Sequence, residues 1–254
     1  MIPDQLNEDK YKTSVPLYIQ IAGSLLTQIE TGELAPDERL PSERILSKRL
    51  NVSRMTLRAA LGELDSKGLL VRRPGDGTYI AKPKIERHAD KLVPFTLSMQ
   101  KRGYITSAKL IVFEQRLADV SVAQHLKIPV STPVFFCQRV RLINQEPVML
   151  ENCTMPVALF QDFGKYDLEG RSLYEIMETE YGVAAHHSEQ SLEAVVAADY
   201  EAETLHIEPG APLMLERRLG YEENNRPFEY GHDLYRGDRF RFFTEIAPLE
   251  AMER

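Results

Sequence analysis

The sequence predicts an α+β chain of two domains, a mainly helical domain followed by one built on an antiparallel sheet. Apolar residues recur with helical spacing before residue 70, whereas apolar runs joined at hairpin-like spacing dominate after residue 130. Charge divides the chain in a similar way. Residues 36–82 carry ten basic and six acidic side chains, although the net charge of the 254 residues is −7. The acidic total therefore does not exclude a polyanionic partner for the basic segment.

Composition excludes several other classes of protein. Hydrophobic residues make up 43 % of the chain, but no run of about 18 apolar residues occurs that could span a membrane. The first residues lack the basic and apolar regions of a secretory signal, so we expect a cytoplasmic protein without membrane contact. Cys137 and Cys153 are too few for a disulfide framework, and in the cytosol we expect both to stay reduced.

Three helices are predicted in the first domain. The first covers 16–31, where leucine and isoleucine recur every four residues, and it ends at Gly32. Ser42 can cap a second helix whose inward side chains are Ile45, Leu46 and Leu50. Ser53 can cap a third helix over 54–67, which ends at Gly68 and buries an apolar stripe of Leu57, Ala60, Leu61 and Leu64.

The second and third helices are joined by about four residues, which is the helix-turn-helix pattern. The third helix carries Arg54 and Arg58 one turn apart, and residues 69–80 predict a β-hairpin with the tip Pro74-Gly-Asp-Gly77. A hairpin in this place is a wing. Arginines can bind phosphates or guanine edges, and glycines allow close approach to a groove. The arginine pair alone is more typical of a solvated helix face, so the order of the elements is what favours DNA binding.

Residues 83–90 are polar, begin with proline and lack periodicity, which predicts a linker between domains at 1–82 and 91–254. The second domain has a mixed pattern. Helices are predicted at 95–102, 120–126, 172–181 and 199–205. Strands are predicted at 134–143, 147–155, 188–196, 213–221, 227–235 and 240–246.

Arg139 and Arg141 lie two residues apart in a predicted strand and therefore point to the same face. A turn centred on Gln145 places Arg139 opposite Glu151 and Cys137 opposite Cys153. Two cations on one sheet face either pair with acids or bind an anion, and the residues leave both possibilities open.

Ser172 begins a predicted helix, where it can form a capping box with Glu175 or hold a phosphate at the free N–H groups. His186 and His187 are neighbours and point to opposite faces of a strand, so we expect no metal site. No nucleophile and base stand in a catalytic arrangement, and we expect no catalytic residue and no cofactor.

Residues 16–80, with the strings LPSER, VSRMTLRAAL and GDGTYI, resemble the winged helix-turn-helix domain of GntR-type bacterial regulators. The resemblance implies that the chain binds near-palindromic double-stranded operator DNA as a homodimer. It assigns Glu43 and Pro41 to packing and capping. The residues that it implies for DNA contact are Arg44, Arg54, Thr56 and Arg58, with Gly75 and Gly77 of the wing at the minor groove.

Residues 91–248 resemble the UTRA effector domain of the HutC-type branch of these regulators, whose fold is similar to a chorismate-cleaving lyase. The similarity is greatest to sensors of phosphorylated amino sugars, as in N-acetylglucosamine utilisation. Leu97 and Ser98 depart from the acidic pair usual there, and His232-Asp233 is more polar than usual. The resemblance implies a phosphate site of Phe95, Thr96, Arg139, Arg141, Ser172 and Tyr174, and a sugar site of Glu151, Glu229 and Tyr235.

These patterns together predict a ligand-responsive transcriptional repressor. The expected effector is N-acetylglucosamine 6-phosphate or glucosamine 6-phosphate. One alternative keeps the DNA-binding role with another effector, which could be a different sugar phosphate, a phosphonate-related compound or a histidine catabolite. The other alternative is an enzyme of the lyase-like fold, which leaves the DNA-binding half unexplained.

Overall fold

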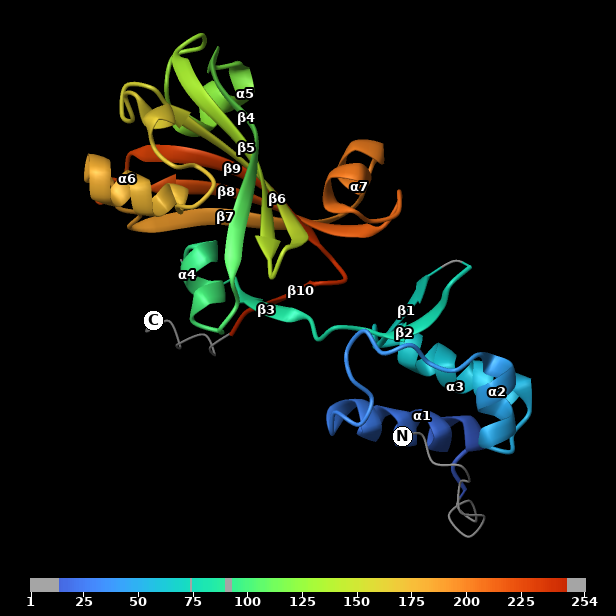
Figure 1. Ribbon diagram of the computed structural model, residues 1–254. Helices are drawn as coiled ribbons and strands as arrows, with labels where there is room; N and C mark the ends of the chain where they lie inside the picture. The colour runs from blue at the N-terminus through green and yellow to red at the C-terminus, as the bar shows by residue number, and fades with distance from the viewer. Residues whose placement is uncertain (1–13, 74, 90–92, 246–254) are drawn as a thin grey trace, which may run out of the picture. The chain divides into compact units, whose positions relative to one another are not determined.

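A computed structural model describes residues 14–73, 75–89 and 93–245. The chain forms two compact units that divide between Lys84 and Ile85. The N-terminal unit contains three helices and a hairpin in its described part (Figure 1). Its elements are α1 (Leu17–Glu30), α2 (Glu43–Arg49), α3 (Arg54–Ser66), β1 (Leu70–Arg73) and β2 (Gly77–Ile80).

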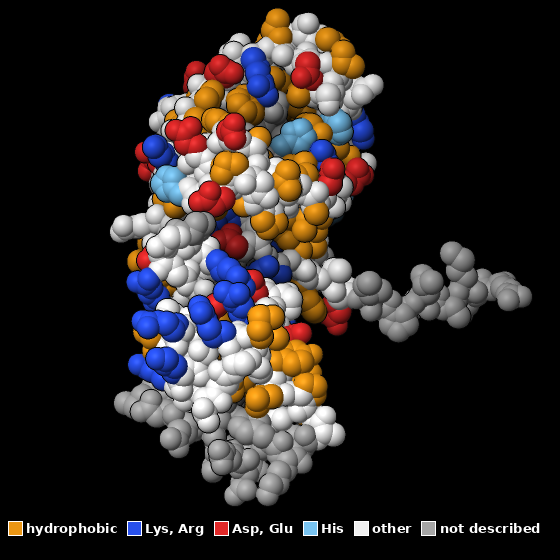
Figure 2. Space-filling view, turned by 90° about the vertical axis from the view of Figure 1, so that its right-hand side faces the viewer, with side chains coloured by type: hydrophobic (Ala, Val, Ile, Leu, Met, Phe, Trp, Pro, Cys, Tyr) orange, Lys and Arg blue, Asp and Glu red, His pale blue; other side chains and the backbone are white. Residues whose placement is uncertain are grey.

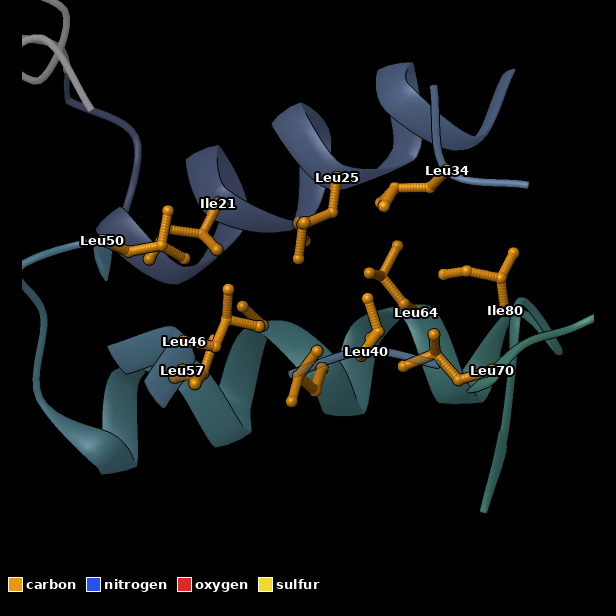
Figure 3. Packing of buried hydrophobic residues seen from close by; sticks show 13 residues of the cluster. Ile21, Leu25, Leu34, Leu40, Leu46, Leu50, Leu57, Leu64, Leu70 and Ile80 are labelled. Atoms are coloured by element: carbon orange, nitrogen blue, oxygen red, sulfur yellow. The ribbon is translucent and has the colours of Figure 1, made fainter. Parts of the chain in front are cut away.

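The core of the N-terminal unit lies between α1 and α3 (Figure 3). Ile21 and Leu25 of α1 face Leu57 and Leu64 of α3, and the hairpin closes one end of this core with Leu70 and Ile80. The apolar stripe predicted for the third helix is buried as expected. The prediction that Ile45 faces inward is wrong, because its side chain is 42 % exposed. Helix α2 has only two turns, and it reaches the core through Leu46 and the C-cap Leu50.

The C-terminal unit is built on an antiparallel sheet with the strand order β4-β5-β6-β9-β8-β7. The predicted α+β class is therefore confirmed. The predicted strands and helices occur within a few residues of their expected bounds. The sheet strands are β4 (Thr106–Leu117), β5 (Pro133–Ile143), β6 (Glu146–Pro156), β7 (His187–Val196), β8 (Pro212–Tyr221) and β9 (Pro227–Arg236).

Helices cover both faces of this sheet. One face is covered by α4 (Phe95–Gln100) and α6 (Leu173–Tyr181), and the other by α5 (Val120–Leu126) and α7 (Asp199–Leu205). A short 3-10 turn, η2 (Phe163–Lys165), packs with α6. None of the helices in the described part of the chain combines the length and apolar character of a membrane span.

Two strands were not predicted from the sequence. β4 is an edge strand whose apolar and polar residues alternate only in its first half. β3 (Ile85–His88) lies inside the predicted 83–90 linker and pairs in parallel with β10 (Phe240–Phe243). The linker prediction is therefore wrong for 85–88, because this strand is stabilised by a partner more than 150 residues away in sequence. Local polarity carries no signal of such a pairing.

The predicted register of the β5–β6 hairpin is confirmed. Arg139 lies opposite Glu151, and Cys137 lies opposite Cys153. A bulge follows Arg141. Both cysteines are free thiols, and burial raises the pKa of Cys137 to about 12. This register places the two arginines on the sheet face that α4 and α6 cover.

Candidate functional site

The start of α3 presents a set of exposed basic side chains. Arg54 and Arg58 on α3 and Arg44 on α2 are all exposed. Ser53 caps α3 as predicted, since its Oγ accepts a hydrogen bond from the Thr56 N–H at 3.0 Å. The Thr56 hydroxyl lies 2.8 Å from the same Oγ, so this side chain also takes part in the cap. In Figure 2, Lys and Arg side chains gather on one side of the N-terminal unit.

Glu43 has a different role from the expected one of packing or capping. Its carboxylate accepts a hydrogen bond from Arg58 Nε at 2.7 Å and links the first turn of α2 to α3. The pair is largely exposed, with 59 % of the Arg58 side chain accessible. Glu43 therefore orients Arg58 while the guanidinium remains open to solvent.

The tip of the hairpin needs glycine at both predicted positions. Gly75 has a φ of +76° and Gly77 a φ of +151°, which other residues rarely adopt. A Cβ at Gly77 would also lie 2.8 Å from Nε of Arg39, whose guanidinium donates to the carbonyl of Asp76. Gly77 thus leaves space for Arg39, which lies in the loop before α2, to hydrogen-bond to the hairpin.

The second set of predicted residues converges on one region of the C-terminal unit. The residues come from α4, β5, β6, the start of α6 and β9. Arg139 and Glu229 are fully buried behind the cavity wall. Thr96 lines an adjoining cavity that also contacts Ser172 and Tyr174. The predicted residues that line the central cavity are Phe95, Arg141, Glu151, Ser172, Tyr174 and Tyr235.

Arg139 is held by protein groups on every side. Its Nε donates to Glu151 Oε2 at 2.7 Å, and Nη2 donates to the same oxygen. Its Nη1 donates to the carbonyls of Leu168 and Arg171 at 2.6 and 3.1 Å. Burial would raise the pKa of Glu151, but Arg139 and Arg141 lower it to about 2. Arg139 therefore ties the hairpin to the segment that leads into α6.

Arg141 faces the cavity and retains an unused donor. Its Nη2 donates to the Thr96 hydroxyl at 2.6 Å, and its guanidinium lies 4.8 Å from the centre of the Phe95 ring. Its contacts with Glu151 are longer, at 3.4 Å. Its Nε is buried and has no hydrogen-bond partner among the described residues. A buried donor without a partner is costly, so this atom marks a place where an acceptor can bind.

Ser172 begins α6 at the cavity wall and is 8 % exposed. The predicted capping box with Glu175 is wrong, since the Ser172 side chain makes no capping hydrogen bond. Glu175 instead accepts from Nε of Arg171, which precedes the helix, at 3.2 Å. The Ser172 hydroxyl and the first N–H groups of α6 therefore have no hydrogen-bond partner among the described residues.

Sequence reasoning missed the most connected side chain of this region, Arg218 on β8. Its Nε donates to the Tyr174 hydroxyl and to Glu229 at 3.0 Å, and its Nη1 donates to Glu216 and Asp233 at 3.1 Å. Arg218, Asp233, Arg87 and Gln190 also line the cavity. The alternation of Glu216 and Arg218, on the same strand face, is the signal that could have indicated a polar cluster.

Comparisons with known proteins agree with this architecture. Residues 17–80 match the family described as bacterial regulatory proteins, gntR family, and residues 101–241 match the UTRA domain. The HTH-type transcriptional repressor NagR of Bacillus subtilis is 36 % identical over 94 % of this chain and 98 % of its own length.

Two further relatives cover most of the chain. The mannosyl-D-glycerate transport/metabolism system repressor MngR of Escherichia coli is 32 % identical over 93 % of this chain and 98 % of its own length. The crystal structure of PhnF from Mycobacterium smegmatis superimposes with a TM-score of 0.64 at 26 % identity, covering 89 % of this chain and 99 % of that one. NagR and MngR are regulators rather than enzymes.

Proposed function

The chain belongs to the GntR family of bacterial regulatory proteins and carries a UTRA domain, and from this premise we propose that it is a ligand-controlled transcriptional repressor. As a cytoplasmic homodimer it binds a near-palindromic operator through the winged helix-turn-helix units. A phosphorylated amino sugar, N-acetylglucosamine 6-phosphate or glucosamine 6-phosphate, binds the C-terminal unit and releases the DNA.

The observation that carries the effector class is the polar chemistry of the central cavity. Arg141 and Ser172 both line the cavity, and each has a donor without a partner among the described residues, which suits a phosphate. Carboxylates and hydroxyls of Glu151, Asp233 and Tyr235 line the same cavity, which suits sugar hydroxyls. The name of MngR, a mannosyl-D-glycerate transport/metabolism system repressor, supports a carbohydrate-derived effector.

The proposed coupling between ligand and DNA follows from the way the chain is divided. The ligand binds only in the C-terminal unit, whereas the operator contacts lie in the N-terminal unit. A ligand can shift the DNA affinity only if it binds differently to the DNA-bound and released arrangements. We infer that these arrangements differ in the spacing of the two winged units of the dimer, which must match the half-sites.

The proposal is tested with operator DNA that the full chain itself selects from a random duplex pool. Adding either sugar phosphate is expected to release the DNA in a fluorescence anisotropy titration. Arg58→Ala should weaken operator binding by about 1–3 kcal/mol if the side chain reads a base. Arg141→Gln should leave operator binding intact and abolish release.

Two results would contradict the proposal. Operator binding that is unchanged in Arg58→Ala would remove the assigned role of α3. Failure of both sugar phosphates to bind or release the DNA would exclude this effector class, and a screen of other acceptor-rich anions would follow.

A further inference from the structure

Arg218 has a donor that no group among the described residues uses. Nε and Nη1 are bound to side chains of α6, β8 and β9, whereas Nη2 has no hydrogen-bond partner among the described residues. The side chain is 8 % exposed and is one of the residues that line the cavity. Arg218 therefore offers an N–H donor to a bound molecule.

The surroundings of Arg218 are shaped to accommodate this side chain. A Cβ at Gly231 would lie 3.0 Å from Nη2 of Arg218 and 3.3 Å from the Glu229 carboxylate. A Cβ at Gly220 would lie 3.0 Å from Glu229 and from the Phe228 ring. These two glycines, on neighbouring strands, leave the space in which the arginine and its carboxylate partner lie.

The charges around Nη2 nearly cancel. Among the described residues, two arginines, Arg87 and Arg218, contact the carboxylates Glu216, Glu229 and Asp233. Burial and the neighbouring carboxylates raise the pKa of Asp233 to about 7, although Arg218 acts to lower it. Part of the Asp233 population is therefore neutral near pH 7. An ammonium group placed here would gain little net attraction and would face the positively charged guanidinium.

Arg141 and Arg218 reach the cavity from separated strands. In the sheet order β5-β6-β9-β8, their strands are three spacings apart, which is roughly 14 Å between backbones. Both side chains nevertheless line the same cavity. A ligand whose phosphate binds at Arg141 can therefore present a different group to Arg218.

We propose that Arg218 is a specificity-determining residue of the effector cavity, where Nη2 donates a hydrogen bond to an uncharged acceptor oxygen of the effector. The carbonyl oxygen of an N-acyl group meets this requirement and an ammonium group does not. The cavity thus selects an N-acylated amino-sugar phosphate over the free amine. This inference rests on the proposed function, because it requires a phosphorylated amino sugar in the cavity.

The test compares two probes that differ only at the nitrogen. Calorimetric titration of the full chain with N-acetylglucosamine 6-phosphate and glucosamine 6-phosphate should show tighter binding of the acetylated sugar, by roughly tenfold or more, the effect of a charge-assisted hydrogen bond. Arg218→Lys keeps the positive charge and loses the forked donor, so the two sugars should bind it with similar Kd values. Arg218→Gln, which removes the charge as well, should also lose the preference.

Arg217→Gln is the matched control, since Arg217 is the neighbouring residue on β8 and pairs with the exposed Glu193 on the other face. It should keep the wild-type ratio of the two Kd values. Equal binding of the two sugars by the wild type, or an unchanged ratio in Arg218→Lys, would overturn the inference while leaving the proposed function in place. Absence of binding of both sugars by the wild type would overturn both.

Discussion

Arg139 and Arg141 stand two residues apart on β5, yet their surroundings give them different tasks. Arg139 is fully buried and its donors are directed to Glu151 and to two carbonyl groups, whereas Arg141 borders the cavity with an unused Nε. Both side chains lie on the same face of the sheet. The segment before α6 distinguishes them, because its carbonyls at Leu168 and Arg171 lie over Arg139 only.

This difference predicts a large stability cost for losing Arg139. Arg139→Met leaves the buried Glu151 carboxylate without its main partner, and we expect the free energy of unfolding to fall by about 3–5 kcal/mol. Urea denaturation measures the change. The double variant Arg139→Met/Glu151→Met removes both charges and should recover part of the loss. Arg217→Met, which breaks an exposed pair, should cost less than about 1 kcal/mol. A similarly small cost for Arg139→Met would contradict the assignment.

The raised pKa of Asp233 predicts how the free energy of unfolding depends on pH. Burial raises its pKa in the folded chain from 3.8 to about 7, so the folded state binds more protons than the unfolded state between these values. The contribution of Asp233 to the free energy of unfolding is fully present below the unfolded-state pKa. It is lost as pH rises toward 7, by up to about 1.4 kcal/mol per pH unit. Glu151 acts in the opposite sense, and its stabilisation is lost only as pH falls from 4.5 toward 2.

Urea denaturation between pH 4.5 and 7.5 checks this expectation. Asp233→Asn should remove most of the decline, whereas Asp162→Asn, on the exposed surface, should leave it unchanged. Asparagine suits position 162, where the backbone is left-handed with a φ of 56°. The same slope in wild type and Asp233→Asn would show that another group is responsible.

Among elements, the helices and the hairpin of the N-terminal unit respond to glycine in opposite ways. Gly23 lies inside α1 with open space around it, so Gly23→Ala should raise the free energy of unfolding by about 0.5–1 kcal/mol. Gly77→Ala should lower it, because the Cβ would meet Arg39 at a backbone conformation that alanine rarely adopts.

Thermal unfolding followed by circular dichroism separates the two outcomes for these elements. Gly62→Ala, inside α3 and also in open space, serves as a second helical control and should behave like Gly23→Ala. Gly77→Ala should also weaken operator binding, since the wing loses its brace. Equal stability effects at 23 and 77 would argue against the described hairpin geometry.

At the scale of the whole molecule, each unit has its own hydrophobic core. Differential scanning calorimetry of the full chain should therefore resolve two transitions. A sugar phosphate at about 100 times its Kd should stabilise the C-terminal unit by roughly 2.7 kcal/mol and leave the other transition in place. Arg141→Gln is the control and should abolish the shift. An equal shift of both transitions would show that the units unfold together.

Local sequence patterns alone determined the helix-turn-helix, the hairpin wing, the β5–β6 register and the acidic and basic division of the chain. Periodicity, caps and turn residues act between near neighbours, so they can be interpreted without a fold. The family resemblance added the residues around the central cavity, and these converge from five elements.

Only the tertiary structure decided how those residues are used. It showed that Arg139 is enclosed while Arg141 borders the cavity, that 85–88 is a strand, and that Arg218 connects Tyr174 with a group of carboxylates. These features depend on contacts between segments that are far apart in the sequence. The physical reason is that burial and charge pairing, which set the role of an ionised side chain, arise only when distant strands pack together.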